Sequence, residues 1–453
     1  MEKRYVSTTN ACKLCTPLGA TLAFRGVQGA APFLHGSQGC ATYMRRYIIS
    51  HFREPMDIAS SSLGEKHAIY GGGANLKKGL LTAMQKYNPR LIGIATTCLT
   101  ETIGDDVAML LAEFKREFSE LPLAELVHVS TPSYSGTHMD GFHAAVRALA
   151  MQQCRDKAAP HTSVNIMPGF VSAADLRHLK EICLGFGVEP TLLPDYSQTL
   201  DGPALDEYQP IPDGGTTLEA IRAMSGAPGS IEFGVGPERS KNLDTAGTWL
   251  EKEYGVPLHR LGLPMGLRRT DSFLDALSQV TGAGVPAEME LERGRLVDAM
   301  VDGHKYVSGA RAIVYGEEEL VAGLVAFLSE IGVVPVLVGT GGKGKNLSAN
   351  IAAAAGDCLA EPPRVLEGVD FYEIAEQARE LAPDLLVGNS KGYRYSREWN
   401  IPLVRVGFPI HDRFGGQRLL HLGHRGALAL YDRIVNAILE KKQSDSPIGY
   451  GYL

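Results

Sequence analysis

Three cysteines stand in short segments rich in glycine or threonine. They are Cys15 in CTPLGA, Cys40 in HGSQGC and Cys98 in TTCLTETIGDD. Each segment has the character of a turn between a strand and a helix, so the three thiolates could converge on one soft-metal centre. Their small neighbours let backbone N–H groups approach bound sulfide, which favours iron–sulfur ligation. The pattern therefore predicts a cluster site.

The segments around these cysteines are long and follow a fixed order. They read LCTPLGATLAFRGVQGAAPFLHGSQGCATYMRRYIISHFREPMDIASSSLGEKHAIYGG, IGIATTCLTETIGDD, STPSYSGTH and IPLVRVGFPIHDR. Together they resemble the beta-type chains of nitrogenase component 1, from Cys15 to the end of the chain. Motifs of this length are far more specific than a short glycine pattern.

The resemblance implies a set of cluster ligands. In that family the matching cysteines hold the beta-side half of an eight-iron P-cluster (8Fe–7S) at the interface with an alpha-type chain. Cys15, Cys40 and Cys98 are therefore expected to bind this cluster or a related 4Fe–4S cluster. Ser133 in TPSYSG matches the serine that can join the oxidised cluster. A serine after proline is also an ordinary turn or N-cap residue, and this alternative stays open.

The resemblance also implies partners and a role. A separate ATP-dependent iron–sulfur reductase would deliver electrons through this chain to a cofactor on the alpha-type chain, in an α2β2 heterotetramer. The sequence contains no nucleophile elbow and no H-E-x-x-H of its own, so no catalytic residue is assigned to it. Within the family, nitrogenase-like reductases of the methylthio-alkane reductase type, which cleave C–S bonds, resemble it most. A scaffold chain for iron–molybdenum cofactor assembly and a true nitrogenase beta chain are the alternatives.

The other four cysteines have simpler interpretations. Cys12 and Cys15 form a C-x-x-C, which is typical of a redox pair or half of a zinc site, but no second C-x-x-C completes a zinc site. We expect Cys12 to be a spare thiol near the cluster. The remaining three lie in stretches with helical, partly apolar character and are expected to be small buried side chains: Cys154, Cys183 and Cys358.

Polar residues near the cysteines are expected to support the site without binding metal. His35 is expected to orient the loop or the cluster sulfides by hydrogen bonding. Glu101, Asp105 and Asp106 place negative charge near a helix start. A solvated or interface face is expected for the basic residues that follow Cys40, namely Arg45, Arg46, His51 and Arg53. The glycine-rich GTGGKGKN lacks the G-x-x-x-x-G-K-[ST] spacing of a P-loop, and we expect a surface loop there.

Composition excludes several classes of protein. The chain has 453 residues, a formal charge of −7 and a hydrophobic content of 44%. Because the sequence predicts neither a basic face nor a charged tail, we do not expect the chain to bind nucleic acid. The sequence has no apolar stretch of bilayer length and no apolar export segment near its start, so neither a membrane nor an export route is expected. The odd cysteine count does not resemble a disulfide framework. We expect a cytoplasmic protein with reduced thiols.

The alternation of apolar runs and amphipathic stretches predicts the elements that position these residues. APFLHG, RLIGIATT and ELVHVST have the character of strands, and LKKGLLTAMQKY and DDVAMLLAEFKREF that of helices. Similar βαβ units recur twice, so we predict an α/β fold of three Rossmann-like, doubly wound domains with parallel sheets. The predicted domains are residues 1–160, which bind the cluster, 161–309, and 310–453 with a C-terminal helix. In such sheets ligands gather where strands end, and Cys40 and Cys98 follow strands.

Overall fold

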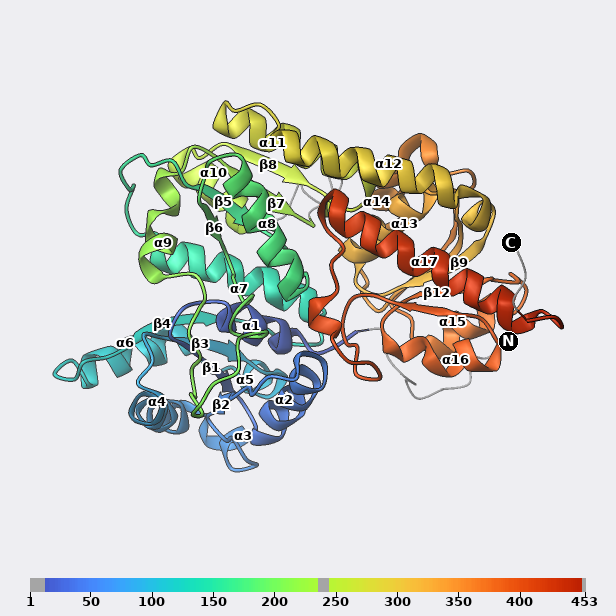
Figure 1. Ribbon diagram of the computed structural model, residues 1–453. Helices are drawn as coiled ribbons and strands as arrows, with labels where there is room; N and C mark the ends of the chain where they lie inside the picture. The colour runs from blue at the N-terminus through green and yellow to red at the C-terminus, as the bar shows by residue number, and fades with distance from the viewer. Residues whose placement is uncertain (1–12, 235–243, 450–453) are drawn as a thin grey trace.

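The computed structural model describes residues 13–234 and 244–449. It contains three parallel β-sheets, each covered by helices, which form three units packed together (Figure 1). In every sheet the first strand in sequence is central and later strands are added on both sides, as in doubly wound folds. The α/β fold class with parallel sheets is thus confirmed. None of the helices in the described residues combines the length and apolar character needed to cross a bilayer.

The first unit contains all three predicted metal-binding cysteines. Its sheet has the order β2-β1-β3-β4, and the two central strands are buried along their whole length. The three strands predicted from APFLHG, RLIGIATT and ELVHVST are confirmed. The strands are β1 (Ala30–His35), β2 (Ala59–Ser60), β3 (Leu91–Thr96) and β4 (Glu125–Val129). The helices are α1 (Thr16–Arg25), α2 (Gln38–Phe52), α3 (His67–Tyr70), α4 (Gly73–Tyr87), α5 (Cys98–Ile103), α6 (Val107–Glu117) and α7 (His138–Gln153).

The second unit has a sheet of the same design, with the order β6-β5-β7-β8. Its last strand reads LHRL and has no fully buried residue. This short sequence carries no clear strand pattern, so the strand was not predicted. The strands are β5 (Val164–Met167), β6 (Pro190–Leu192), β7 (Ser230–Phe233) and β8 (Leu258–Leu261). The helices are α8 (Ala173–Gly185), α9 (Leu218–Ala223), the 3₁₀ turn η1 (Met224–Gly226), α10 (Ala246–Tyr254) and α11 (Gly266–Thr281).

The third unit follows the long helix α12 (Ala287–Val307) and has a five-stranded sheet with the order β11-β10-β9-β12-β13. The C-terminal helix packs beside α12, away from the first unit (Figure 1). The strands are β9 (Arg311–Tyr315), β10 (Val334–Thr340), β11 (Arg364–Glu367), β12 (Leu385–Gly388) and β13 (Leu403–Arg405). The helices are α13 (Glu318–Glu330), α14 (Leu347–Ala355), η3 (Gly356–Cys358), α15 (Phe371–Ala378), η4 (Ser390–Gly392), α16 (Tyr393–Glu398), η5 (Gly416–Arg418) and α17 (Gly423–Asp445).

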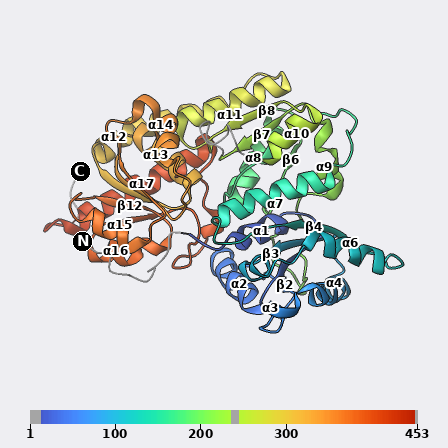
Figure 2. The same ribbon diagram turned by 180° about the vertical axis from the view of Figure 1, so that it is seen from behind.

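One hydrophobic core runs through all three units and joins them. It contains Phe24 of the first unit, Leu179 of the second and Val314 of the third. Helix α7 lies between the first and second sheets in both views (Figures 1 and 2). The three sheets draw their strands from residues 30–129, 164–261 and 311–405. The predicted boundaries near 160 and 309 lie between these ranges, and the division into separate domains stays a prediction.

Candidate metal centre

Each of the three predicted metal-binding cysteines lies at the start of a helix. Cys15 is the N-cap residue of α1, Cys40 is in the first turn of α2, and Cys98 is the first residue of α5. The first N–H groups of a helix have no partner within it, and the positive end of the helix dipole favours negative charge there. The start of a helix is therefore a favourable place for a negatively charged group.

Two of the cysteines follow the central pair of strands, β1 and β3. The strand order of the first sheet reverses between these two strands, and ligands of parallel sheets bind outside such a point. The two loops touch because residue 36 is glycine: a Cβ there would lie 2.2 Å from Thr97 Oγ1. The backbone N–H of Thr97 also donates to His35 O at 3.1 Å. The structure thus places the Cys40 and Cys98 loops side by side, as predicted.

The third cysteine, Cys15, precedes α1, which packs closely against the start of α7. A Cβ on Gly19 would lie 1.6 Å from the carbonyl oxygen of His138, and a Cβ on Gly141 would lie 1.9 Å from that of Thr16. Glycine at both positions lets the two helix backbones approach. The loop before α7 carries Ser133, whose Oγ accepts a hydrogen bond from the N–H of Thr16 at 3.2 Å. The residue after Cys15 is therefore held against Ser133.

Ser133 also contacts the thiol of Cys98 directly. Its backbone N–H donates to Cys98 Sγ at 3.2 Å. Ser133 therefore links the start of α1 to Cys98, and the structure brings it together with Cys15 and Cys98. On α2, Ser37 Oγ donates to Cys40 Sγ at 3.3 Å. Hydrogen bonds to sulfur are a known means of tuning iron–sulfur clusters.

A tyrosine pair lies on α2 beyond Cys40. Tyr47 hydrogen-bonds Tyr43 with 3.1 Å between the hydroxyl oxygens. Burial raises the pKa of Tyr47 to about 12, and the bond to Tyr43 adds to the shift.

The three thiols fit an iron–sulfur group by their donor chemistry and their accessibility. Cys15 is exposed, whereas Cys40 and Cys98 are half-buried. Two of the three sulfurs accept hydrogen bonds, as thiolate ligands do. In the described residues, no group of three or more His, Cys, Asp and Glu side chains is arranged to hold a single metal ion. Cys12 lies outside the described residues.

His35 supports the loops around the site, as expected of a residue that does not bind metal. It is buried, and its ring nitrogens lie 2.9 Å from Ser61 Oγ and 3.0 Å from Asp105 Oδ2. Burial lowers the pKa of His35 despite the opposing effect of Asp105, so the ring is a neutral hydrogen-bonding group. Asp105 also accepts from the N–H of Gly72 at 3.0 Å. The pair thereby ties β1 to the loops before α4 and α6.

The expectation for His51 was wrong. It was grouped with Arg45, Arg46 and Arg53 on a solvated or interface face, but its side chain is buried and its Nδ1 accepts from the N–H of Ile410 at 2.9 Å. The helical period places His51 on the same side of α2 as the buried Met44 and Ile48. Its ring packs edge-on against Phe408, 4.9 Å between centroids, and so connects the first and third units.

The cysteines outside the site divide into two kinds. Cys154 and Cys183 are buried, as expected, and burial raises the pKa of each thiol to about 12. Cys154 Sγ also donates to Ile221 O at 2.7 Å. Cys358 is half-buried in the turn η3, which contradicts the expectation of a buried side chain, because its segment leaves the helix α14 and reaches the surface.

Two supporting residues were missed or underestimated from the sequence. Ser37 was not selected, although an N-cap serine three residues before Cys40 is a readable signal. Glu101 was expected chiefly to place negative charge near a helix start. Its Oε1 accepts from Ser130 Oγ at 2.6 Å and from Thr96 Oγ1, which fastens the end of β3 to the segment after β4.

Comparison with known proteins decides the family. The nitrogenase component 1 type oxidoreductase family matches residues 15–439, which begin at the first predicted ligand and include the other two. This chain belongs to that family. Component 1 beta chains resemble it over nearly their full length. The nitrogenase molybdenum-iron protein beta chain of Clostridium pasteurianum is 36% identical over 433 residues, covering 95% of this chain and 93% of that protein. The corresponding chain of Azotobacter vinelandii is 34% identical, covering 98% and 86%.

Solved structures agree with the beta-type assignment of this component 1 chain. A chain of the structure described as "Nitrogenase Cp1 at pH 6.5" superposes with a TM-score of 0.94 and 34% identity, covering 100% of this chain and 98% of that one. A chain of "Nitrogenase Cp1 at pH 5" gives a TM-score of 0.70 at 17% identity, which shows the fold alone. The chain is thus a beta-type component 1 subunit of an oxidoreductase complex.

Proposed function

We propose that this chain holds an iron–sulfur cluster through Cys15, Cys40 and Cys98, shared with an alpha-type chain, and passes electrons across that interface. The observation that carries this is that three helix-start thiols are not fully buried in the single chain, that Ser133 links the start of α1 to Cys98, and that the Cys40 and Cys98 loops are in contact. Accessible thiols leave room for a second chain to complete the ligand set. The cluster is an 8Fe–7S P-cluster or a related 4Fe–4S cluster.

The residues of this chain would hold and tune such a cluster. When bound, the cluster would supply one-electron redox chemistry. Ser37 and the N–H of Ser133 donate to two sulfurs and stabilise their negative charge. Ser133 Oγ accepts from Thr16 and keeps its own proton, so its ligation to iron would release that proton. Electron transfer at this site would then be linked to pH.

The partners follow from the incomplete ligand set. We infer that an alpha-type chain covers the exposed Cys15 and that two such pairs form an α2β2 heterotetramer. An ATP-dependent iron–sulfur reductase would supply the electrons, and the substrate-binding cofactor would lie on the alpha-type chain. Co-expression of both chains, followed by mass photometry, tests the assembly. A chain that stays monomeric beside its partner and binds a full cluster alone contradicts it.

The substrate needs its own test. Methylthio-alkane C–S bond cleavage is our first proposal, and dinitrogen reduction is favoured as the second because the relatives named above are nitrogenase beta chains. The purified complex, supplied with its reductase, ATP and a low-potential donor, should be offered dimethyl sulfide, dinitrogen and acetylene in turn. Methane from dimethyl sulfide supports the first proposal. Ammonia from dinitrogen without methane replaces it with the second.

A scaffold for cofactor assembly is the remaining alternative, because it would share the thiols but not the turnover. Cys98→Ala removes the thiol nearest Ser133 while leaving the alpha-type chain unchanged. If electrons cross this chain, the variant should lose ATP-dependent reduction although its partner keeps its cofactor. Failure of the parent complex to reduce any of the three substrates, together with transfer of its cofactor to an apo-nitrogenase, would establish the scaffold instead.

A further inference from the structure

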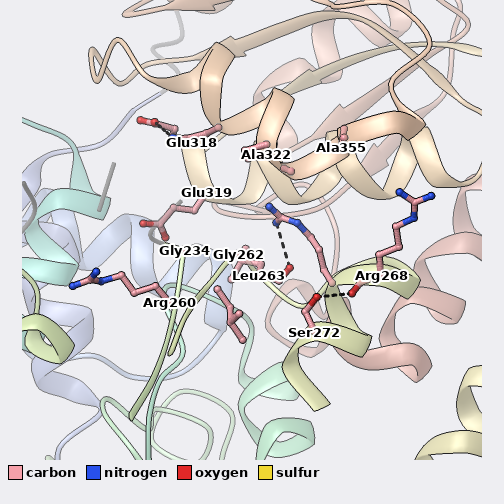
Figure 3. A pocket seen from close by; sticks show the side chains of 16 residues that line it. Gly234, Arg260, Gly262, Leu263, Arg268, Ser272, Glu318, Glu319, Ala322 and Ala355 are labelled. Atoms are coloured by element: carbon pink, nitrogen blue, oxygen red, sulfur yellow. Dashed lines mark hydrogen bonds between the residues drawn. The ribbon is translucent and has the colours of Figure 1, made fainter. Parts of the chain in front are cut away.

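A cavity of about 340 Å³ lies between the second and third units, at elements that contribute no thiol to the metal centre (Figure 3). One wall is formed by the end of β8 and the start of α11, and the other by α13 and α14. Gly234, which follows β7, lies at its edge. The carboxyl ends of parallel strands are the usual place for ligands in α/β sheets. The volume is at the lower end of the range of ligand pockets, so a small molecule fits.

The first wall presents a guanidinium that lacks a close counter-ion. Arg269 lines the cavity and is half-buried, and burial lowers the pKa of its guanidinium to about 10. Its Nη1 donates a long hydrogen bond, of 3.4 Å, to Leu263 O. The described part of the chain places no carboxylate within ion-pair distance of it, and Glu330 acts on it only from farther away. A desolvated cation of this kind favours a bound anion.

The opposite wall contains two buried side-chain acceptors that lack donors in the described residues. Asn350 Nδ2 donates to Glu318 Oε1 at 3.0 Å, which leaves Asn350 Oδ1 buried with no hydrogen-bond partner in the described residues. Glu319 Oε1 lies 2.7 Å from His143 Nε2, and its other oxygen, Oε2, is likewise buried without a partner there. Because unsatisfied buried acceptors are costly, this wall favours a ligand that donates hydrogen bonds.

The wall formed by α13 and α14 also carries small apolar side chains. Ala322, Ala353, Ala354 and Ala355 come from α13 and α14. Figure 3 shows Glu318, Glu319, Ala322 and Ala355 on the helices of one wall and Arg260, Gly262, Leu263, Arg268 and Ser272 on the other. The cavity therefore combines a cationic wall, an acceptor wall and a short apolar surface.

We propose that this cavity binds a small zwitterionic amino acid, with its carboxylate at Arg269 and its ammonium group at Glu319 and Asn350. The two charged ends of such a ligand match the two walls, and a short side chain would lie on the alanines. A plain carboxylic acid would leave the acceptor wall unsatisfied, and an amine without a carboxylate would leave Arg269 unpaired. The site is independent of the proposed cluster.

Binding of free amino acids to the full-length chain tests this site. The proteinogenic L-amino acids are screened at millimolar concentration by thermal shift and then measured by titration calorimetry. Alanine is compared with ethylamine and propionate, which each lack one of its charged groups, and with lactate, whose hydroxyl replaces the ammonium. At least one small amino acid should bind, and loss of either charged group should weaken binding roughly tenfold or more. Absence of binding by every amino acid overturns the proposal, as does tighter binding of lactate than of alanine.

Variants locate the binding. Arg269→Gln removes the charge of the first wall, and Ala354→Leu fills the apolar space without changing any charge. Each should weaken binding roughly tenfold or more while the iron content of the assembled complex stays unchanged. The matched control is Arg295→Gln on the exposed side of α12. If Arg269→Gln does not fold, Ala354→Leu decides the question. Unchanged affinity in a folded Ala354→Leu protein refutes this cavity as the site.

Discussion

At the residue scale the account depends on what touches the sulfur atoms. The sequence led to Cys15, Cys40, Cys98 and Ser133, and the structure places Ser133 between the start of α1 and Cys98. The sequence did not predict which atoms the individual side chains reach with their hydrogen bonds. An N-cap serine such as Ser37 satisfies a helix N–H in many proteins, and only the fold shows that its hydroxyl also reaches the Cys40 sulfur.

Ser133 provides a prediction at this scale. Ser133→Ala removes the hydroxyl but keeps the backbone N–H that reaches Cys98, so the complex should retain its iron. The spectrum of the oxidised cluster should change, since the alanine has no oxygen to offer iron. EPR spectra of the oxidised complex at several pH values measure this. Ser135→Ala is the control, because Ser135 Oγ donates only to Pro132 O, at 2.7 Å. An oxidised spectrum identical in all three proteins rules out the redox-ligand role.

At the element scale, the buried strands could be predicted from the sequence, whereas the edge strand β8 could not. β1 and β3 are wholly buried, and their aliphatic runs predicted them. β8 was missed because its polar residues are stabilised by pairing with β7, which a local sequence pattern does not show. His51 was misplaced because its basic neighbours suggested a solvated face, while the spacing from Met44 and Ile48 indicated burial.

The contact between the β1–α2 and β3–α5 loops yields a second prediction. Gly36→Ala introduces a Cβ that would lie 2.2 Å from Thr97 Oγ1, so it should lower the free energy of unfolding by roughly 1–3 kcal/mol through overpacking. It should also separate the Cys40 and Cys98 loops and reduce iron incorporation. Chemical denaturation and iron analysis measure the two effects.

A matched substitution and a rescue sharpen this test. A Cβ on Gly64 would meet nothing within 4 Å, so Gly64→Ala should leave both quantities nearly unchanged. Adding Thr97→Ala to Gly36→Ala should recover part of the lost stability. If Gly36→Ala alone has no effect, the tight contact between the loops is not needed for the site.

At the scale of the whole molecule, the metal-binding unit is tied to the other two by buried contacts. α2 carries the predicted ligand Cys40 in its first turn and His51, which contacts the third unit, in its last turn. The recurring βαβ pattern predicted three α/β units, but residues far apart in sequence make the contacts between them. No local sequence pattern identifies contacts of this kind, so the sequence alone could not predict them.

His51 gives a pH prediction for the whole molecule. Burial lowers the pKa of His51 to about 3, against the smaller opposing effect of the hydrogen bond with Ile410, and the positive charge of Arg53 adds to the lowering. Because an unfolded histidine titrates near about 6.5, its contribution to stability is complete above that pH and is lost as pH falls toward 3. The unfolding free energy should decrease by a few kcal/mol over this window, and His51→Gln should flatten the decrease. His259→Gln on the half-exposed strand β8 should not. If the unfolding free energies of His51→Gln and of the parent protein change with pH in the same way, the buried His51 does not make the expected contribution to stability.

The most direct test of the central claim is the iron content and EPR spectrum of the anaerobically purified complex. Cys15→Ala, Cys40→Ala and Cys98→Ala are each co-expressed with the alpha-type chain and compared with Cys358→Ala, which alters a half-buried thiol outside the site. Because alanine cannot replace a thiolate ligand, each of the first three variants should lower the iron content and change the spectrum, and Cys358→Ala should do neither. Wild-type iron content and spectra in all four variants would contradict the assignment of a cluster to these cysteines.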